Sequence, residues 1–465
     1  MERFVLDGQN LSISSIPQIA QNQVKLEFCP KSLERLYETL KIVHNAQTKH
    51  VPVYGLTRNV GRFKNEDLKS DSFDQEVLSM HSTILGHENQ DYYPLEVCKG
   101  AWTILANGFL NGGSFASLEL LEEMRVWIND PDSGSGLKIE YNTSIGMADA
   151  IPLMQMAQNI LPSKYKVKHG EGLALLSSNA LTMSELCFSL RKIQKVLDLT
   201  EKSTALAILA ENGNKSIILD QGFNASQWSE KQNVILKIRD LLENLESNQD
   251  SLHSHLSLRA SCDILASTIE AQKHSTKILE EMMNSHQGNP YVCRQSGSIG
   301  SVANFDSTRL FNVFTYLQTA FGNLCLSLVR RGEYKVNEFG EANKQAMIQR
   351  YIHWHLETCN RGAVLNAQAV PVSLARMAGA KGIEDWAPPT PELSQRIGKL
   401  IEFGYKIIVL ESLLSAMVVH EKGIEVPTKL KEFYGVLIDH SPLELPIGQQ
   451  YSMKSLFDTL SQKYK

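Results

Sequence analysis

The sequence lacks the features that mark secreted and metal-stapled proteins. Seven cysteines are scattered over 465 residues, and no two of them form a CxxC pair. A disulfide framework or a zinc knuckle is therefore not indicated, and reduced thiols are expected. The opening residues, MERFVLDGQNLSISSI, carry acidic side chains and no long apolar run, so we expect no signal peptide there. Together these absences favour the cytoplasm.

Signals for membranes, nucleic acids and metals are also missing. No run of about 18 residues is apolar and uncharged, which predicts no membrane-spanning helix. The formal net charge is −5, without the basic excess typical of nucleic-acid binding, and there is no P-loop, GxGxxG or HExxH motif. HWH at residues 353–355 is a poor chelate, because residues two apart on a helix do not share a face. The two histidines of HSHLSLR, at residues 253–259, are an ambiguous signal for metal binding. We expect no metal site in this sequence.

What the sequence does contain is helical periodicity. Apolar residues recur at three- and four-residue spacing in the segments 32–46, 95–112, 117–130, 184–211, 257–285, 307–334 and 392–419. The last three are long and strongly apolar. They predict a mainly α fold whose long helices share a central bundle, partly buried against other subunits. Strand signals are weak and limited to pieces such as KSIILDQ at residues 215–221.

Irregular segments separate these helices at residues 54–74, 131–142, 288–305 and 360–390, where much of the Gly, Pro and Asn lies. In a helical scaffold such loops are where chemistry usually sits. The pattern predicts a loop-rich N-terminal active-site domain over residues 1–185. A long-helix bundle follows over 186–425, and a C-terminal tail segment over 426–465.

An ordered series of motifs resembles the histidine, phenylalanine and tyrosine ammonia-lyases and their aminomutases. VLDGQNLSIS at the start is similar to the family's LDGxxLT, and VPVYGLTRNVGRF (51–63) to its YGV-NTGFG segment. STILGHENQ (82–90) looks like LLxSHAxG, and ILANGFLNGGS (104–114) like LRANSLAKGYSG. GEGLALLSSNA (170–180), LEEMMNSHQGNPYV (279–292) and SGSIGSVANFD (296–306) resemble KEGLALINGT, LEIELNSATDNPLV and LSGGNFHG. The series covers nearly the whole chain in order.

Two spacings extend the resemblance. Arg259 precedes Asn284 by the interval that follows the arginine of the family's YSLR, and Glu384 precedes Glu411 by the interval that follows the glutamate of its QEDH. The resemblance implies a central bundle of long helices of the ammonia-lyase and fumarase–aspartase type. It also implies a homotetramer in which each active site takes loops from three chains. A single chain would then be inactive.

The loop that carries the family's chemistry is altered. In the family it reads GASGDLxPLAHMA, and its Ala-Ser-Gly triplet cyclises with loss of water to an electrophilic methylidene-imidazolone. This chain reads GMADAIPLMQMA, with Met147 at the serine and Ala148 at the glycine, between Gly146 and Asp149. Cyclisation needs an unhindered glycine nitrogen and a β-hydroxyl, and methionine has no hydroxyl. Ser144 has one, but the β-branched residue after it crowds a tight turn. We therefore expect no prosthetic group and no other cofactor.

The positions that surround the prosthetic group in the family are changed as well. Ser177 replaces the asparagine of LALING, Leu256 the tyrosine of YSLR, and Ile383 the glutamine of QEDH. The positions that hold the substrate are retained. The positions around the prosthetic group are thus lost, while those that hold the substrate are kept. This difference indicates that the pocket is reused.

The resemblance assigns roles to the retained residues. Tyr54 stands at the catalytic base, a role that requires its pKa to be lowered by nearby positive charge or by the helix N-termini of the tetramer. Arg259 stands where the family binds the substrate carboxylate, a shape suited to a guanidinium. Glu384 is a second catalytic candidate, and the remaining substrate-binding candidates are Gly61, His87 and Asn304. The plain alternatives are a structural ion pair between Arg259 and Glu384, and a tyrosine that merely packs.

The expected function is that of an ammonia-lyase-like enzyme without the prosthetic group. It would act on an amino acid or a related aromatic carboxylate, free or bound as a thioester to a carrier protein, by elimination, isomerisation, addition or condensation. One alternative is a non-catalytic homologue that binds an aromatic ligand or a partner protein. Another is ordinary ammonia-lyase activity by unusual means. Room for a small acid beside Tyr54 favours an enzyme, whereas a pocket filled by Met147, Leu256 and Ile383 favours binding.

Overall fold

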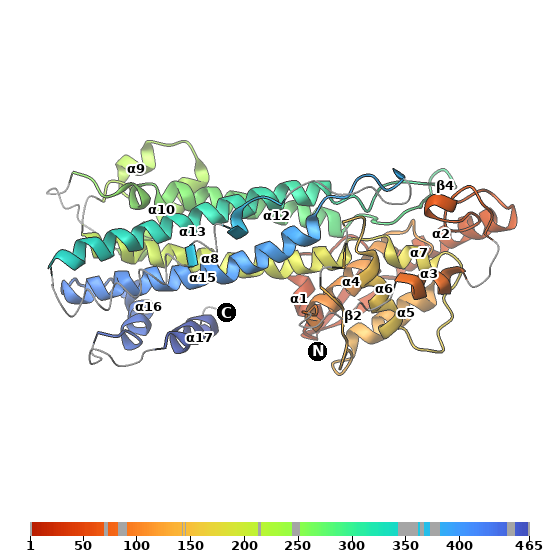
Figure 1. Ribbon diagram of the computed structural model, residues 1–465, viewed down its shortest axis with the longest axis horizontal. Helices are drawn as coiled ribbons and strands as arrows, with labels where there is room; N and C mark the ends of the chain where they lie inside the picture. Colours follow the sequence, from red (N-terminus) through yellow and green to blue (C-terminus); the bar gives the residue numbers. More distant parts are fainter. Residues whose placement is uncertain are drawn as a thin grey trace. The chain divides into compact units, whose positions relative to one another are not determined.

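The computed structural model describes residues 2–68, 73–81, 91–141, 143–144, 146–212, 215–243, 252–342, 361–362, 367–372, 382–443 and 452–463. Within these residues the fold is mainly α, as Figure 1 shows. The chain divides into two compact units, each built from three separate stretches. Unit 1 comprises Met1–Arg191, Ser275–Phe314 and Val372–Gln395, and unit 2 comprises Lys192–His274, Thr315–Pro371 and Arg396–Lys465. The three domains expected from the sequence (1–185, 186–425 and 426–465) are, by contrast, each one continuous stretch of the chain.

Unit 1 contains the strands that the described residues form. β1 (Glu2–Leu6) and β2 (Val24–Phe28) pair in parallel, and β3 (Tyr291–Cys293) pairs antiparallel with β4 (Ser298–Gly300). Its shorter helices are α1 (Ser15–Ala20), α2 (Pro30–Thr48), the 3-10 helix η1 (Gly61–Phe63), α3 (Phe73–His81), α4 (Leu95–Asn111), α5 (Leu118–Asn129), α6 (Ala150–Ile160) and α7 (Glu171–Leu176).

Helix α4 forms the centre of unit 1. Its residues 97–110 are all buried, and α1, α2 and α5 pack against it. It stops at Gly112, whose φ of +87° favours glycine. Helix α5 starts after Ser117, whose Oγ accepts a hydrogen bond of 3.2 Å from the N–H of Leu120. The helices predicted at 95–112 and 117–130 are therefore confirmed.

Among the described residues, four long helices contribute to both units: α8 (Ala180–Glu211), α12 (Ser261–Met283), α13 (Thr308–Ala342) and α15 (Thr390–Glu421). They confirm the long helices predicted from periodicity. In unit 2 neighbouring helices are joined by hydrogen bonds, such as that of 3.2 Å from Thr268 Oγ1 on α12 to the carbonyl of Ala320 on α13. The shorter helices of unit 2 are α9 (Asp220–Asn224), α10 (Ser229–Leu242), α11 (Leu256–Arg259), α16 (Thr428–Asp439) and α17 (Lys454–Lys463).

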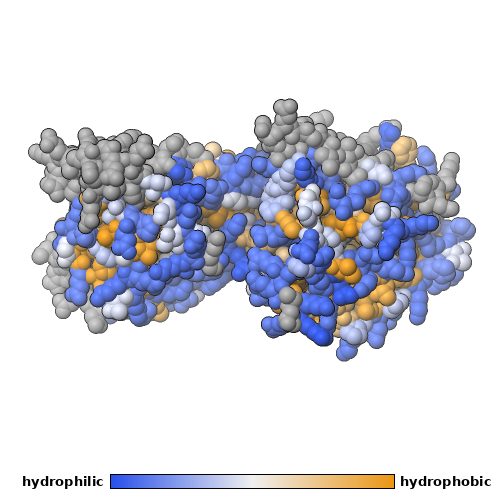
Figure 2. Space-filling model, turned by 90° about the horizontal axis from the view of Figure 1, so that it is seen from below, coloured by the Kyte–Doolittle hydropathy of each residue, from blue (hydrophilic) through white to orange (hydrophobic). Residues whose placement is uncertain are grey.

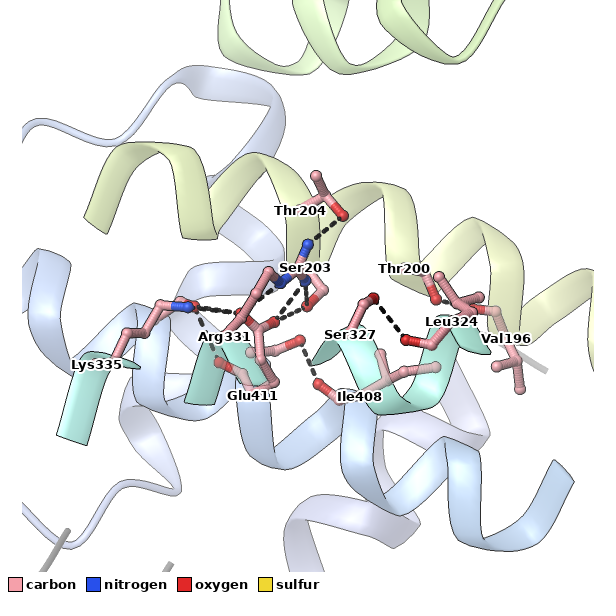
Figure 3. Close-up of polar contacts among 12 residues, drawn as sticks. Val196, Thr200, Ser203, Thr204, Leu324, Ser327, Arg331, Lys335, Ile408 and Glu411 are labelled. Atoms are coloured by element: carbon pink, nitrogen blue, oxygen red, sulfur yellow. Dashed lines mark hydrogen bonds and ion pairs between the residues drawn. The ribbon is translucent and has the colours of Figure 1, made fainter. Parts of the chain in front are cut away.

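A buried charge cluster ties three of the long helices together in unit 2 (Figure 3). Glu411 of α15 lies 3.0 Å from Arg331 Nη2 and 2.7 Å from Lys335 Nζ, both on α13. Ser203 of α8 donates a hydrogen bond to the same carboxylate, and Arg331 donates one of 3.0 Å to Thr204. All three charged side chains are at most 1% exposed. Because buried charges must be paired, this cluster fixes how α8, α13 and α15 meet.

The structure differs from the sequence-based expectation in local elements. Residues 215–221 are not a strand: they form turns, and α9 begins at Asp220. The helix expected over 257–285 is broken at Ala260, so α11 ends at Arg259 and α12 begins at Ser261. The strands β1 to β4 were not expected from periodicity, because strands this short carry too few alternations to be recognised.

One stretch, Glu171–Glu211, is long and apolar enough to cross a membrane by length and composition alone. The expectation from the sequence concerned runs without any charged residue, whereas these criteria allow two charged residues in a window of 18. Of its most apolar part, however, 89% is buried inside the protein, as in the core helix of a soluble protein. On the face that Figure 2 draws, hydrophobic residues gather in patches among mostly hydrophilic ones.

Candidate active site

A pocket of about 380 Å³, open to solvent, lies in unit 1. Its wall is mostly apolar, and Glu384 is its only charged side chain among the described residues. A volume of this size fits a small organic ligand. The lining residues are Tyr54, Thr143, Met147, Ala148, Ala150, Ile151, Leu173, Leu176, Ser177, Asn289, Phe305 and Glu384.

Tyr54 reaches this pocket from the loop after α2. The backbone N–H of Gly61, a residue with φ of +57°, donates a hydrogen bond of 2.9 Å to the Tyr54 phenol oxygen. Burial raises the pKa of Tyr54 above its usual 10.0, the hydrogen bond from Gly61 opposes this, and the charge of Glu384 raises the pKa further. The expected lowering of this pKa therefore does not occur within the single chain, because burial outweighs the hydrogen bond from Gly61 and the charge of Glu384 acts in the same direction as burial.

The altered loop lies against the same pocket in a tightly held conformation. Gly146 has φ of +85°, and a Cβ placed on it would lie 2.1 Å from the carbonyl oxygen of Pro388. Ala148 has φ of +59°, the left-handed region in which glycine is favoured over residues with a Cβ. The loop thus keeps the backbone form of a glycine at position 148 although alanine stands there.

Asp149 anchors the end of this loop in the core. Its carboxylate accepts hydrogen bonds from the Thr182 N–H and hydroxyl, both 2.8 Å, and from Ser144 Oγ at 2.9 Å. Its own N–H donates to the Ser178 carbonyl at 2.7 Å. Burial raises the pKa of Asp149, and these hydrogen bonds oppose the rise. Asp149 is accordingly a structural anchor, and Met147 and Ala148, just before it, line the pocket.

The loop does not fit the family's methylidene-imidazolone. Met147 has a thioether where the chemistry requires a β-hydroxyl to eliminate, and the nitrogen of Ala148 carries a substituted α-carbon where the family has glycine. Both side chains line the pocket instead.

Met147 leaves the pocket open. Neither Leu256 nor Ile383, which were expected to fill it in a binding protein, is among its lining residues, and their exposed fractions are 67% and 40%. Ser177 does line the pocket, at the C-terminal end of α7.

Two other retained candidates, Asn304 and Arg259, are not among the lining residues of this pocket. The amide nitrogen of Asn304 lies 3.1 Å from Nδ1 of His286, whereas the next residue, Phe305, does line the pocket. Arg259 belongs to unit 2 and is exposed. Among the described residues of its own unit, neither Arg259 nor Glu384 makes an ion pair, and the plain alternative of a structural ion pair between them stays a prediction. His87 lies outside the described residues.

Several lining residues were missed from the sequence. Leu173 and Leu176 belong to the GEGLALLSSNA segment, and Asn289 and Phe305 to two other recognised motifs. The resemblance marked these segments but did not indicate which side chains turn inward. In the part of the chain that the structure describes, no group of three or more His, Cys, Asp or Glu residues could hold a metal ion. His353 and His355 lie outside it.

Comparisons with known proteins agree with this architecture. The sequence profile described as "Aromatic amino acid lyase" matches residues 11–161 and 150–421. The histidine ammonia-lyase of Staphylococcus aureus strain JH9 is 22% identical, with 98% of each chain covered. That of Natranaerobius thermophilus is also 22% identical, with 71% of this chain and 70% of the relative covered.

Solved structures of similar fold include ergothionase, an ergothioneine-degrading enzyme of Treponema denticola, in complex with desmethyl-ergothioneine sulfonic acid. Its TM-score is 0.87 at 19% identity, with 100% of this chain and 98% of that chain covered. The phenylalanine aminomutase of Pantoea agglomerans has a TM-score of 0.87 at 14% identity, with coverages of 99% and 98%. At these identities the likeness establishes the shared helical-bundle fold.

Proposed function

Because the chain belongs to the aromatic amino acid lyase family, we propose that it is an ammonia-lyase-like enzyme that works without the family's methylidene-imidazolone. Its substrate is an amino acid or a related aromatic carboxylate, either free or bound as a thioester to a carrier protein. The observation that carries this proposal is the pocket. Met147 and Ala148 stand in place of the reactive residues, yet about 380 Å³ remains open beside Tyr54 and Glu384.

The lining chemistry supports an amino-acid-like ligand. The Glu384 carboxylate offers a partner for a ligand ammonium group, and a charge-assisted hydrogen bond is among the stronger polar contacts. Ile151, Leu173 and Phe305 form part of an apolar wall that suits an aromatic or aliphatic body. Tyr54 acts as the general acid–base between these two ends.

Tyr54 needs a positive charge to act as a base, since its pKa is raised within the single chain. We assign that charge to Arg259 of another chain in a homotetramer, where it also binds the substrate carboxylate. Support comes from the exposure of Arg259, whose side chain is accessible to a second chain. Gly61, His87 and Asn304 complete the proposed substrate-binding set.

A second candidate is a non-catalytic homologue that binds an aromatic ligand or a partner protein. The raised pKa of Tyr54 favours it, because a phenol that stays protonated is a poor base. The apolar wall and Glu384 would then serve to hold a ligand rather than to transform it.

A turnover screen separates the two. The purified assembly is incubated with amino acids, ergothioneine, the corresponding unsaturated acids and small amines, beside the Tyr54→Phe variant, and the mixtures are read by mass spectrometry. A product formed by the wild type and lost in Tyr54→Phe supports the enzyme. A product that persists in Tyr54→Phe overturns the role of Tyr54. No product from any substrate, with ligand binding retained, supports the binding protein.

A further inference from the structure

Unit 2 contains a second pocket, of about 330 Å³, which shares no lining residue with the candidate active site. It is open to solvent, and its walls come from helices α8, α10 and α12. Two glutamates, two lysines and three aliphatic side chains are among its lining residues. A volume of this size suits a small organic ligand that has both a polar and an apolar part.

Contacts outside this pocket hold α10 against α12. The indole Nε1 of Trp228, just before α10, donates a hydrogen bond of 2.6 Å to Glu270 on α12. Lys231 Nζ on α10 lies 2.7 Å from the Asp263 carboxylate, also on α12. The pocket walls are therefore joined by the protein itself, and their arrangement does not depend on a ligand.

Each carboxylate of the pocket wall is paired through only one of its oxygens. Glu201 Oε1 on α8 lies 2.8 Å from Lys237 Nζ on α10. Glu230 Oε2 on α10 lies 2.5 Å from Lys273 Nζ on α12. No residue that the structure describes donates a hydrogen bond to Glu201 Oε2 or to Glu230 Oε1. Two acceptor oxygens of lining residues are thus left for the N–H groups of a ligand.

The carboxylates of this pocket lie deeper than the ammonium groups that pair with them. The side chains of Glu201 and Glu230 are 12% and 13% exposed. Those of Lys237 and Lys273 are 55% and 60% exposed, because a lysine can lay its carbon chain along the surface and keep its charge in water. The inner polar groups of the pocket are therefore hydrogen-bond acceptors with negative charge.

The electrostatics at Glu201 favour a cation. Burial raises the pKa of Glu201 above its usual 4.5, and the hydrogen bond and charge of Lys237 oppose this rise. The negative charges of Asp198 and Glu230 raise the pKa further. A ligand ammonium group would offset these two charges, and its hydrogen bond to a carboxylate is of the stronger, charge-assisted kind.

Aliphatic side chains form the rest of the surface that a ligand would contact. Leu197 of α8 and Ile269 of α12 are buried, whereas Leu236 of α10 is 47% exposed. An aliphatic ligand body would remove part of the Leu236 side chain from water, which favours binding. The pocket therefore combines acceptor oxygens with an apolar surface.

We propose that this pocket is a second ligand site, which binds a small aliphatic amine with its ammonium group on the carboxylates of Glu201 and Glu230 and its body against Leu236. The site does not depend on the proposed function, because the two pockets have no lining residue in common. An alcohol with the same carbon skeleton binds more weakly, since it lacks the charge that the carboxylates select.

Methyl NMR on the assembled protein tests this site. Labelling the isoleucine δ1-methyl groups with ¹³C reports both pockets, because Ile269 lines this one and Ile151 lines the candidate active site. The signals are assigned by their loss in Ile269→Val and Ile151→Val. At neutral pH, 3-methylbutan-1-amine should shift the Ile269 signal saturably, and 3-methylbutan-1-ol should bind about tenfold more weakly. A shift of Ile151 alone, or equal affinities for the two probes, overturns the inference.

Surface variants keep the test independent of folding. Leu236→Lys adds a cation at an exposed position of the pocket wall and should weaken the amine response of Ile269 about tenfold. Glu201→Gln, which removes a carboxylate, should weaken it to a similar extent. Val126→Lys makes a matched change at an exposed position of unit 1 and should leave the response within about twofold. Equal responses in Leu236→Lys and Val126→Lys overturn the inference and leave the proposed function untouched.

Discussion

The N–H of Gly61 donates a hydrogen bond of 2.9 Å to the phenol oxygen of Tyr54, on the wall of an open pocket. This contact favours the phenolate, but burial and the charge of Glu384 outweigh it, so the pKa of Tyr54 is raised. Within one chain the proposed base, Tyr54, therefore lacks a positive charge that would lower its pKa. The proposed function therefore depends on where the positive charge that lowers the pKa of Tyr54 comes from.

Arg259→Met should raise the pKa of Tyr54 in the assembled protein. Removing a nearby cation destabilises the phenolate, so the ionisation of Tyr54 moves to higher pH. The measurement is the ultraviolet titration of the phenolate, taken as the difference between each protein and its Tyr54→Phe counterpart. Arg3→Met, which breaks a surface ion pair with Glu27, is the control and should shift nothing. An unchanged titration in Arg259→Met would place Arg259 away from Tyr54.

Glu384→Gln should lower the pKa of Tyr54 and weaken amine binding. The carboxylate raises the pKa of Tyr54, so its loss shifts the titration toward lower pH. The loss of a charge-assisted hydrogen bond should reduce affinity for 2-phenylethylamine about tenfold or more. Asp385→Asn removes an exposed charge one residue away and serves as the control. Equal weakening in both variants would show a general charge effect in place of a specific contact.

The paired change Met147→Ser with Ala148→Gly should restore cyclisation of the loop. The backbone at residue 148 already has a left-handed φ of +59°, and Gly146 is held against Pro388. The glycine nitrogen would bond to the carbonyl carbon of residue 146 with loss of one water, and the serine hydroxyl would leave with the α-proton as a second. Intact mass spectrometry should show the loss of two water molecules.

The controls for this pair are Met147→Ser alone and Met147→Ala with Ala148→Gly. The first lacks the unhindered nitrogen and the second lacks the hydroxyl, so both should keep their full mass. If the doubly changed chain folds but keeps its full mass, the loop is not held in a conformation that permits cyclisation.

Glu411→Gln should destabilise unit 2 by about 3–5 kcal/mol, because Arg331 and Lys335 would be left as buried cations without their carboxylate. Burial raises the pKa of Glu411, but the two cations outweigh it and hold the pKa at about 2, below the usual 4.5. This stabilisation is complete above pH 4.5 and is lost as the pH falls toward 2. Denaturant unfolding across this range should show the loss in the wild type and little of it in Glu411→Gln.

The control for this variant is Glu402→Gln, which breaks an exposed i,i+4 pair with Lys406 on the same helix. Its cost should be about 0.5 kcal/mol or less. A similar cost for both variants would mean that the buried cluster contributes no more than a surface pair.

The sequence was informative about the long helices because they carry many turns of apolar periodicity. The predicted segment 392–419 lies within α15, Thr390–Glu421. It was uninformative about β1 and β2, whose pairing joins two short segments through backbone hydrogen bonds that leave little trace in side-chain pattern. The break at Ala260 was also missed, because no glycine or proline marks it.

The candidate site was predictable to the level of loops and only partly to the level of side chains. Tyr54, Met147, Ala148 and Glu384 all line one pocket, as their positions in recognised motifs indicated. Asn304 does not line it; its amide nitrogen lies 3.1 Å from Nδ1 of His286, a residue within a recognised motif to which the resemblance gave no role. The direction of the Tyr54 pKa depends on burial and on Glu384, and both arise only when distant segments fold together.

The intact mass of the purified wild-type chain tests the central claim most directly. The account predicts the mass of the unmodified sequence, because Met147 and Ala148 supply neither the hydroxyl nor the free glycine nitrogen that cyclisation requires. A mass lower by two water molecules, located by fragmentation to residues 146–148, would show that the prosthetic group forms after all. The proposal of an enzyme that works without it would then be contradicted.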